Sequence, residues 1–129
     1  IRSIKGKEWT IDFANEVYEN VKKHKVFITN LGKCTQIDAR PLPDKVYKEY
    51  LNLFKKEMEI VNPKVIILFG NQVSSIVLDE KISVSNVRKK LCVKKINNKD
   101  FNFYSVFYPI GNGSFNVDKW IISNMEEKI

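Results

Sequence analysis

Four polar side chains with chemical potential follow an apolar segment in the stretch KVFITNLGKCTQIDARPLP, residues 25–43. They are Asn30, Lys33, Cys34 and Arg40. An asparagine amide presents donors and an acceptor on one plane, which suits recognition of the edge of a pyrimidine base. Lysine and arginine suit contacts with phosphate groups. Asparagine at a strand end also satisfies local backbone groups, and without further context this second role is the usual one.

Basic residues form two groups along the chain. Lys33, Arg40 and Lys45 surround the loop at 31–43, and a second group contains Arg88, Lys89, Lys90, Lys94 and Lys95. A run of charges is usually a solvated face, whereas cations that line a binding site hold phosphates. We favour phosphate contact for Arg40 in particular, because Pro41 and Pro43 stiffen its loop.

A third segment with chemical potential is Tyr108-Pro109, followed by IGNGSF. Gly111 and Gly113 allow the backbone to approach a ligand closely, although an isolated Gly-x-Gly more commonly serves a turn. Templates for other chemistries are absent from the sequence: a nucleotide phosphate loop, a dinucleotide glycine fingerprint, a nucleophile elbow and a His/Cys metal set. The only histidine, His24, is expected at a helix end rather than as a catalytic base.

Length and composition indicate one globular domain. The chain has 129 residues, of which 43% are hydrophobic and 29% charged, with a net charge of +7. A basic protein of this kind suits a polyanionic partner such as nucleic acid, although a lysine-rich composition without such a partner is equally consistent. No apolar run is long enough to span a membrane. We expect a cytoplasmic monomer in which Cys34 and Cys92 are free thiols.

The elements that must position these residues alternate between helices and strands. The spacing predicts helices over 10–24, 44–61, 71–79 and 116–127, strands over 25–30 and 64–70, an irregular stretch over 80–90, and a hairpin of 90–96 with 101–109. This order predicts an α/β fold, a three-layer α/β/α sandwich around a mostly parallel central sheet. Ligands in such sheets bind beyond the carboxyl ends of strands, and three loops qualify by position: those after Asn30, Gly70 and Pro109.

Taken in order, ITNLGKC, ARPLP, a long helix, NPKVIILFGNQ and FYSVFYP resemble the uracil-DNA glycosylase superfamily, with its iron–sulfur family-four branch as the most similar part. The resemblance covers roughly residues 7–112. It implies a single uracil-DNA glycosylase-like domain over 1–129, incomplete at its N-terminus. The implied activity is excision of uracil or a related damaged base from DNA by base flipping and N-glycosidic bond hydrolysis.

The resemblance also implies roles for individual residues. Asn30 would read uracil, and Tyr108, which replaces the family histidine, would bind the base and assist catalysis by donating a hydrogen bond to uracil O2. DNA contacts would fall on Lys33, Arg40, Gly111 and Asn112. Cys34 matches a cluster ligand, but the next ligand position is Tyr50. A 4Fe–4S cluster therefore cannot be completed from this chain, and we expect no metal or cofactor.

The chain departs from the family at the Gly-Glu-Ala-Pro-Gly motif that positions the attacking water, because Ile1 begins too late to include it. We expect this motif either in an upstream segment or to be replaced in a divergent member. Three hypotheses follow: a DNA glycosylase, a catalytically inactive nucleic-acid-binding domain with the same fold, and a small α/β domain that binds a nucleotide or a protein. Salt-dependent DNA binding would separate the first two from the third.

Overall fold

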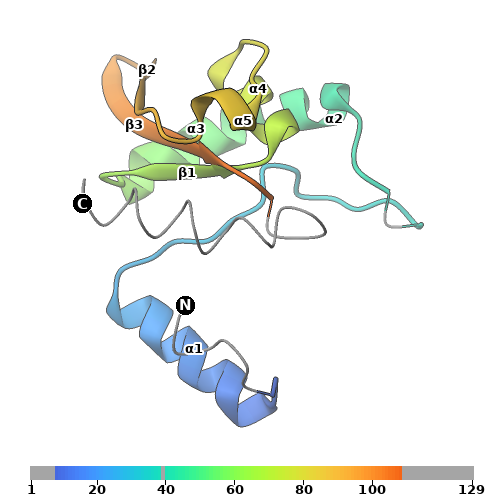
Figure 1. Ribbon diagram of the computed structural model, residues 1–129, viewed down its shortest axis with the longest axis vertical. Coiled ribbons are helices and arrows are strands. Elements are labelled where there is room, and N and C mark those ends of the chain that lie inside the picture. Colours follow the sequence, from blue (N-terminus) through green and yellow to red (C-terminus); the bar gives the residue numbers. More distant parts are fainter. Residues whose placement is uncertain (1–7, 39, 109–129) are drawn as a thin grey trace. The chain divides into compact units, whose positions relative to one another are not determined.

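The structure is a computed structural model that describes residues 8–38 and 40–108 (Figure 1). The chain divides into two compact units, one up to Asn30 and the other from Leu31 onward. Each unit is described by itself. Within the described ranges, no helix is both long and apolar enough to cross a membrane.

The first unit contains helix α1, Ile11–Lys23. The Thr10 hydroxyl accepts a hydrogen bond from the Phe13 amide at 3.1 Å and so caps the helix start. Lys22 and Lys23 lie in the last turn, where positive charge complements the helix dipole. The sequence prediction of a helix over 10–24 is confirmed to within a residue at each end.

The segment after α1 differs from its prediction. Residues 25–30 were expected to form a buried strand, but the structure assigns no strand there. Val26, Phe27 and Ile28 are 52%, 53% and 75% exposed. Lys25 has a φ of 55°, in the left-handed region, so the chain turns as it leaves the helix. A β-branched sequence forms a strand only where it pairs with a neighbour and is covered, and this segment pairs with no strand in the described ranges.

Two consecutive helices open the second unit, α2 (Asp44–Glu49) and α3 (Leu51–Val61). The sequence predicted one helix over the same range, and the structure divides it at Tyr50, where φ is −89° and ψ is −3°. Phe54 and Met58 of α3 are buried. The helix ends at Asn62, which has a φ of 50°, directly before Pro63. Left-handed asparagine followed by proline is a common way for a helix to stop.

The second unit contains a three-stranded sheet with the order β1-β3-β2, built from β1 (Ile66–Phe69), β2 (Cys92–Ile96) and β3 (Lys99–Val106). Strand β1 runs parallel to β3, with Ile66 opposite Phe103. Strand β2 runs antiparallel to β3, with Cys92 opposite Phe103. The predicted α/β class and hairpin are therefore confirmed. The described sheet is mixed, and a three-layer sandwich with a mostly parallel sheet stays a prediction.

The turn of the hairpin is shorter than the four residues, 97–100, that the sequence prediction left between the two arms, because Lys99 and Asp100 belong to β3. Asn97 and Asn98 have φ values of 48° and 71°, which is the conformation of a tight two-residue turn between twisted strands. The Asn97 amide donates to Glu59 Oε1 at 2.7 Å, and the Lys99 ammonium donates to Asn62 Oδ1. These contacts fasten the turn to the end of α3.

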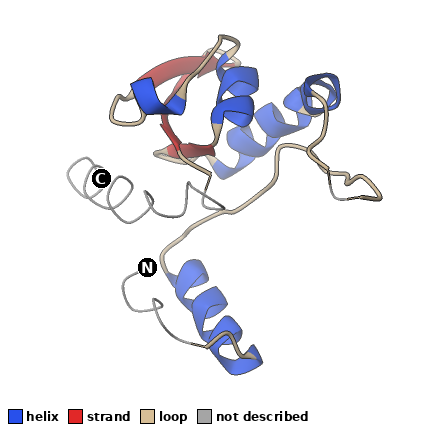
Figure 2. Cartoon of the chain, turned by 45° about the vertical axis from the view of Figure 1, so that its right-hand side comes forward, coloured by secondary structure: helices blue, strands red, loops and turns tan. Residues whose placement is uncertain are grey.

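One face of the sheet carries the core. Helix α4 (Asn71–Leu78) follows β1, and α3 and α4 supply apolar residues to the same buried cluster as the sheet (Figure 2). Among its members are Phe54, Met58, Ile66, Leu68, Ile76, Leu78, Phe101 and Phe103. The stretch predicted to be irregular contains a short helix, α5 (Val84–Val87), because the Asn71 side chain accepts a hydrogen bond from the Val84 amide at 2.8 Å. The predicted helix over 116–127 lies outside the described residues.

Candidate functional site

The parallel strands β1 and β3 end side by side. The Gly70 amide, directly after β1, donates a hydrogen bond to the Val106 carbonyl oxygen at 2.8 Å. Gly70 has a φ of +88°, and a Cβ atom at this position would lie 3.6 Å from the Tyr108 Cβ. The residues directly after β1 and after β3 therefore lie side by side, and the predicted loop after Pro109 lies outside the described residues. Tyr108 is 56% exposed, so its side chain is open to a ligand.

The loop at 31–43 is fastened to the start of α4, close to Gly70 in the chain. The Gln72 amide donates to the Leu42 carbonyl oxygen at 3.0 Å and to Asp44 Oδ1 at 2.7 Å. Leu31 is buried in the core cluster at the other end of the loop. Gln72 was missed by the sequence reasoning, although a polar residue directly after a strand-ending glycine is a usable signal. These contacts fix the C-terminal end of the loop beside the carboxyl end of β1.

Close packing at Gly32 also fixes the loop. A Cβ atom at Gly32 would lie 2.6 Å from Leu42 Cδ1 and 3.0 Å from Tyr47 Cε1. Such distances are shorter than ordinary van der Waals contact, so a Cβ atom at this position would require the Leu42 and Tyr47 side chains to shift. The glycine of the ITNLGKC stretch therefore has a packing role.

Asn30 is exposed and is the last residue of the first unit, whereas Tyr108 belongs to the second. The Asn30 side chain is therefore exposed to solvent and is not part of the core. The structure describes the two units separately, so the role of Asn30 as a base-reading residue stays a prediction.

Lys33 has an ionic partner that the sequence did not indicate. Its ammonium nitrogen lies 3.0 Å from Glu57 Oε1 of α3, and the two side chains are only 28% and 22% exposed. The second carboxylate oxygen of Glu57 is buried and has no hydrogen-bond partner among the described residues. Lys33 therefore neutralises a carboxylate under the loop.

Arg40 lies on the exposed part of the same loop. Its side chain pairs with Asp38, and its amide also donates to Asp38 Oδ1 at 3.3 Å. The Gln36 amide donates to the Pro41 carbonyl oxygen at 2.9 Å, which closes the loop on itself. The Arg40 side chain is 78% exposed, so a phosphate can reach its guanidinium in competition with Asp38.

Cys34 and Tyr50 lie together, at the two positions that the resemblance assigns to cluster ligands. A side-chain hydrogen bond with Cys34 raises the pKa of Tyr50 above its ordinary value of 10.0, and burial adds to the effect. A 4Fe–4S cluster is normally held by four cysteine thiolates, and a thiol beside a phenol supplies one. No cluster of three or more potential metal ligands occurs in the part of the chain that the structure describes. The residues present do not fit such a cluster.

The other residues that the sequence selected have different outcomes. Gly111 and Asn112 lie outside the described residues. In the second basic group, Lys94 donates to the Leu78 carbonyl oxygen, and Lys95 lies 3.4 Å from Asp100. The Arg88 guanidinium lies 5.4 Å from the centre of the Phe107 ring. These three cations have partners within the domain, which is the usual role of a charge run on a surface.

Comparison with known protein families adds one finding. A model of the uracil DNA glycosylase superfamily matches residues 7–119, which is nearly the whole chain. The match extends the sequence resemblance beyond the segment on which it was first based. It is to the superfamily as a whole, and similarity to the iron–sulfur branch stays a prediction.

Proposed function

The chain belongs to the uracil DNA glycosylase superfamily, and on that premise we propose that it binds DNA and excises uracil or a related damaged base. The observation that carries the proposal is the meeting of Tyr108 with Gly70 at the carboxyl ends of two parallel strands. Open α/β sheets bind their ligands at this edge. We further propose that the protein acts as a cytoplasmic monomer.

Excision requires the base to leave the duplex. In the proposed mechanism the target nucleotide rotates out of the stack, and the N-glycosidic bond is then hydrolysed. Negative charge develops on the departing uracil, mainly at its carbonyl oxygens. The Tyr108 hydroxyl donates a hydrogen bond to O2, which stabilises this charge without supplying a cation. Loss of one such donor commonly lowers the rate by roughly a hundredfold or more in enzymes that rely on it.

Selection of uracil is assigned to Asn30. Its amide would pair with N3 and O4 of uracil, whereas cytosine would present a donor and an acceptor in the opposite arrangement. Mismatched buried polar groups are costly, so the wrong base is rejected. The exposed position of Asn30 agrees with a side chain that is not needed for the core.

We assign the contacts with the DNA backbone to the loop at 31–43 and to the segment after Tyr108. Arg40 would contact a phosphate after releasing Asp38, and Lys33 would add positive charge from the same loop. Gly111 and Asn112 complete the proposed DNA contacts. Cationic contacts of this kind make affinity fall steeply with salt concentration.

The test is excision from a labelled oligonucleotide that contains one uracil, with the full-length protein in excess and alkaline cleavage of the abasic product. Tyr108→Phe removes the hydroxyl and should lower the rate about a hundredfold. Tyr18→Phe is the matched control, because Tyr18 is exposed to a similar degree, 62% against 56%, on α1. Intact substrate at high enzyme excess would reject the enzymatic proposal.

A second candidate function has its own support. Tyr108 stands where the family resemblance places a histidine, and a phenol cannot become a cation during catalysis. The alternative is a catalytically inactive nucleic-acid-binding domain with the same fold. It predicts salt-dependent binding that is indifferent to an inserted uracil, whereas the glycosylase requires preference for uracil and loss of that preference in Asn30→Ala. Absence of DNA binding would reject both and favour a protein or nucleotide partner.

A further inference from the structure

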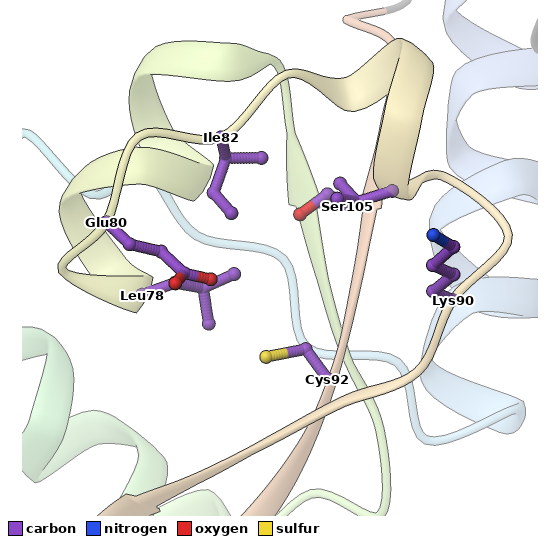
Figure 3. Close-up of a pocket in the computed structure, with 7 residues that line it drawn as sticks. Leu78, Glu80, Ile82, Lys90, Cys92 and Ser105 are labelled. Atoms are coloured by element: carbon purple, nitrogen blue, oxygen red, sulfur yellow. The ribbon is translucent and has the colours of Figure 1, made fainter.

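A small cavity lies away from Tyr108, between the end of α4, α5 and the strands β2 and β3 (Figure 3). Its volume is about 70 Å³. The lining is mostly apolar and consists of Leu78, Glu80, Ile82, Val87, Lys90, Cys92 and Ser105. Two of these residues carry reactive or polar groups on the sheet, the Cys92 thiol and the Ser105 hydroxyl.

The hydroxyl of Ser105 points into this space. Ser105 is only 3% exposed, and Figure 3 shows its oxygen directed toward the space bounded by Leu78 and Ile82. Within residues 8–38 and 40–108, no side-chain hydrogen bond satisfies this hydroxyl. A buried polar group without a partner is costly, so a hydrogen-bonding occupant would be stabilised here.

The walls of the cavity are fixed by hydrogen bonds from outside it. The Ser75 hydroxyl accepts from the Ile82 amide at 2.9 Å, and the Lys94 ammonium donates to the Leu78 carbonyl oxygen. The Asn71 side chain holds the Val84 amide at 2.8 Å and so positions α5. These bonds fix the segments at Leu78, Ile82 and Val84 that surround the cavity, so we expect the cavity to persist when empty.

Size and charge select the occupant. A water molecule occupies roughly 30 Å³ in the liquid, so about 70 Å³ admits a very small molecule and excludes one as large as glutathione. Glu80 and Lys90 place one negative and one positive charge in the lining, which favours a neutral guest over an ion. Hydrogen peroxide is a neutral molecule of this size that can hydrogen-bond to a hydroxyl and react with a thiol.

We propose that Cys92 is a peroxide-oxidation site that Ser105 assists. The Cys92 sulfur, as the thiolate, attacks one peroxide oxygen; an S–O bond forms, the O–O bond breaks, and hydroxide leaves and takes up the proton that the thiol released. Sulfur is oxidised by two electrons to a sulfenic acid, and the peroxide is reduced to water. Ser105 holds the transferred oxygen by a hydrogen bond. Cys92 is half-buried and the cavity is too small to hold a molecule of glutathione size, so the sulfenic acid should persist.

The experiment treats the folded protein with limiting hydrogen peroxide and follows a gain of one oxygen on the Cys92 peptide by mass spectrometry. Ser105→Ala should slow this gain about fivefold, the factor that corresponds to one net hydrogen bond. Ser74→Ala is the matched control, because Ser74 is also fully buried with a hydroxyl unsatisfied among the described residues, and it lies outside the cavity. Its rate should equal that of the unmodified sequence.

A second measurement requires no variant of the cavity. tert-Butyl hydroperoxide, which carries the same reactive group on a bulkier frame, should leave Cys92 unmodified while the exposed Cys34 reacts. Glutathione added after hydrogen peroxide should reduce Cys34 and leave the oxygen on Cys92. Equal reaction of Cys92 with both peroxides, equal rates in Ser105→Ala and Ser74→Ala, or no oxidation of Cys92 would each overturn the proposal. If Ser105→Ala does not fold, the comparison of peroxides decides alone.

Discussion

The ammonium of Lys33 lies 3.0 Å from the carboxylate of Glu57, and this pair fastens the loop at 31–43 to helix α3. A residue selected from the sequence for its charge is therefore also part of the support of its own loop. The finding matters for any mutation at Lys33, because a loss of the proposed DNA binding and a loss of stability would occur together.

Lys33→Ala should lower the free energy of unfolding by about 1–2 kcal/mol, since it leaves the Glu57 carboxylate largely buried without its counter-charge. Urea unfolding of the single variant measures this loss. The double variant Lys33→Met with Glu57→Gln should recover part of it, because the uncompensated charge is then gone. Equal destabilisation of the single and double variants would show that the ion pair is not the cause.

Asp38→Asn should strengthen DNA binding, because it releases the Arg40 guanidinium from its partner. Exposed ion pairs contribute roughly 0.2–1 kcal/mol, which sets the expected gain at about 1.4-fold to fivefold in affinity. Fluorescence anisotropy with a labelled duplex at two salt concentrations measures it. Asp100→Asn is the control, because Asp100 pairs with Lys95 and carries the same charge. A gain of the same size in both variants would indicate a general effect of net charge.

Cys34→Ala should lower the pKa of Tyr50, because the hydrogen bond with Cys34 is the main cause of its elevation. A tyrosine whose pKa is raised by folding stabilises the native state below its unfolded pKa, near 10, and this contribution is lost as the pH rises through the folded value. The unfolding free energy should therefore decline less steeply above pH 10 in Cys34→Ala than in the original sequence. Phenolate absorbance during an alkaline titration, with Tyr50→Phe as the reference, assigns the change to Tyr50.

Gly32→Ala should destabilise the second unit by about 1–3 kcal/mol, the usual cost of forcing extra volume into a packed site. The added Cβ would meet Leu42 and Tyr47 at distances below normal contact. Thermal or urea unfolding gives the loss. Adding Leu42→Ala makes room for the new methyl group, so the two changes together should cost less than their sum. Strict additivity would refute the proposed clash.

The sequence predicted those elements that local chemistry determines. The helix at α1 follows from the spacing of its apolar residues and its threonine cap, and the hairpin itself was predicted, although with a longer connection than the turn at Asn97 and Asn98. Residues 25–30 failed as a strand because a strand depends on a neighbour that the sequence of the segment does not supply. The sequence around Tyr50 contains no proline or glycine that would predict the division of 44–61 into two helices.

The proximity of Gly70 and Tyr108 follows from the strand pairing, whereas the side-chain contacts around them do not follow from the sequence. Tyr108 and the residues after Gly70 meet because parallel neighbours end at the same edge, which the order of elements already indicated. The partners of the cations, Glu57 and Asp38, were not identified in advance. Gln72 reaches Asp44 across 28 residues of chain, and such a contact depends on how two helices pack. The sequence shows which charged and polar side chains are available, whereas the packing of the chain determines which of them pair with one another.

The order of the strands has a consequence for how the domain folds. Hairpin β2–β3 is local and closes on a two-residue turn, whereas β1 must pair with β3 across the intervening α4, α5 and β2. Non-local pairing carries the larger loop-closure entropy, so capture of β1 by a preformed hairpin is expected to limit the refolding rate. A change at Asn97 or Asn98 that weakens the turn should then slow refolding more than it accelerates unfolding. A chain emerging from the ribosome would hold β1 unpaired until β3 had been synthesised.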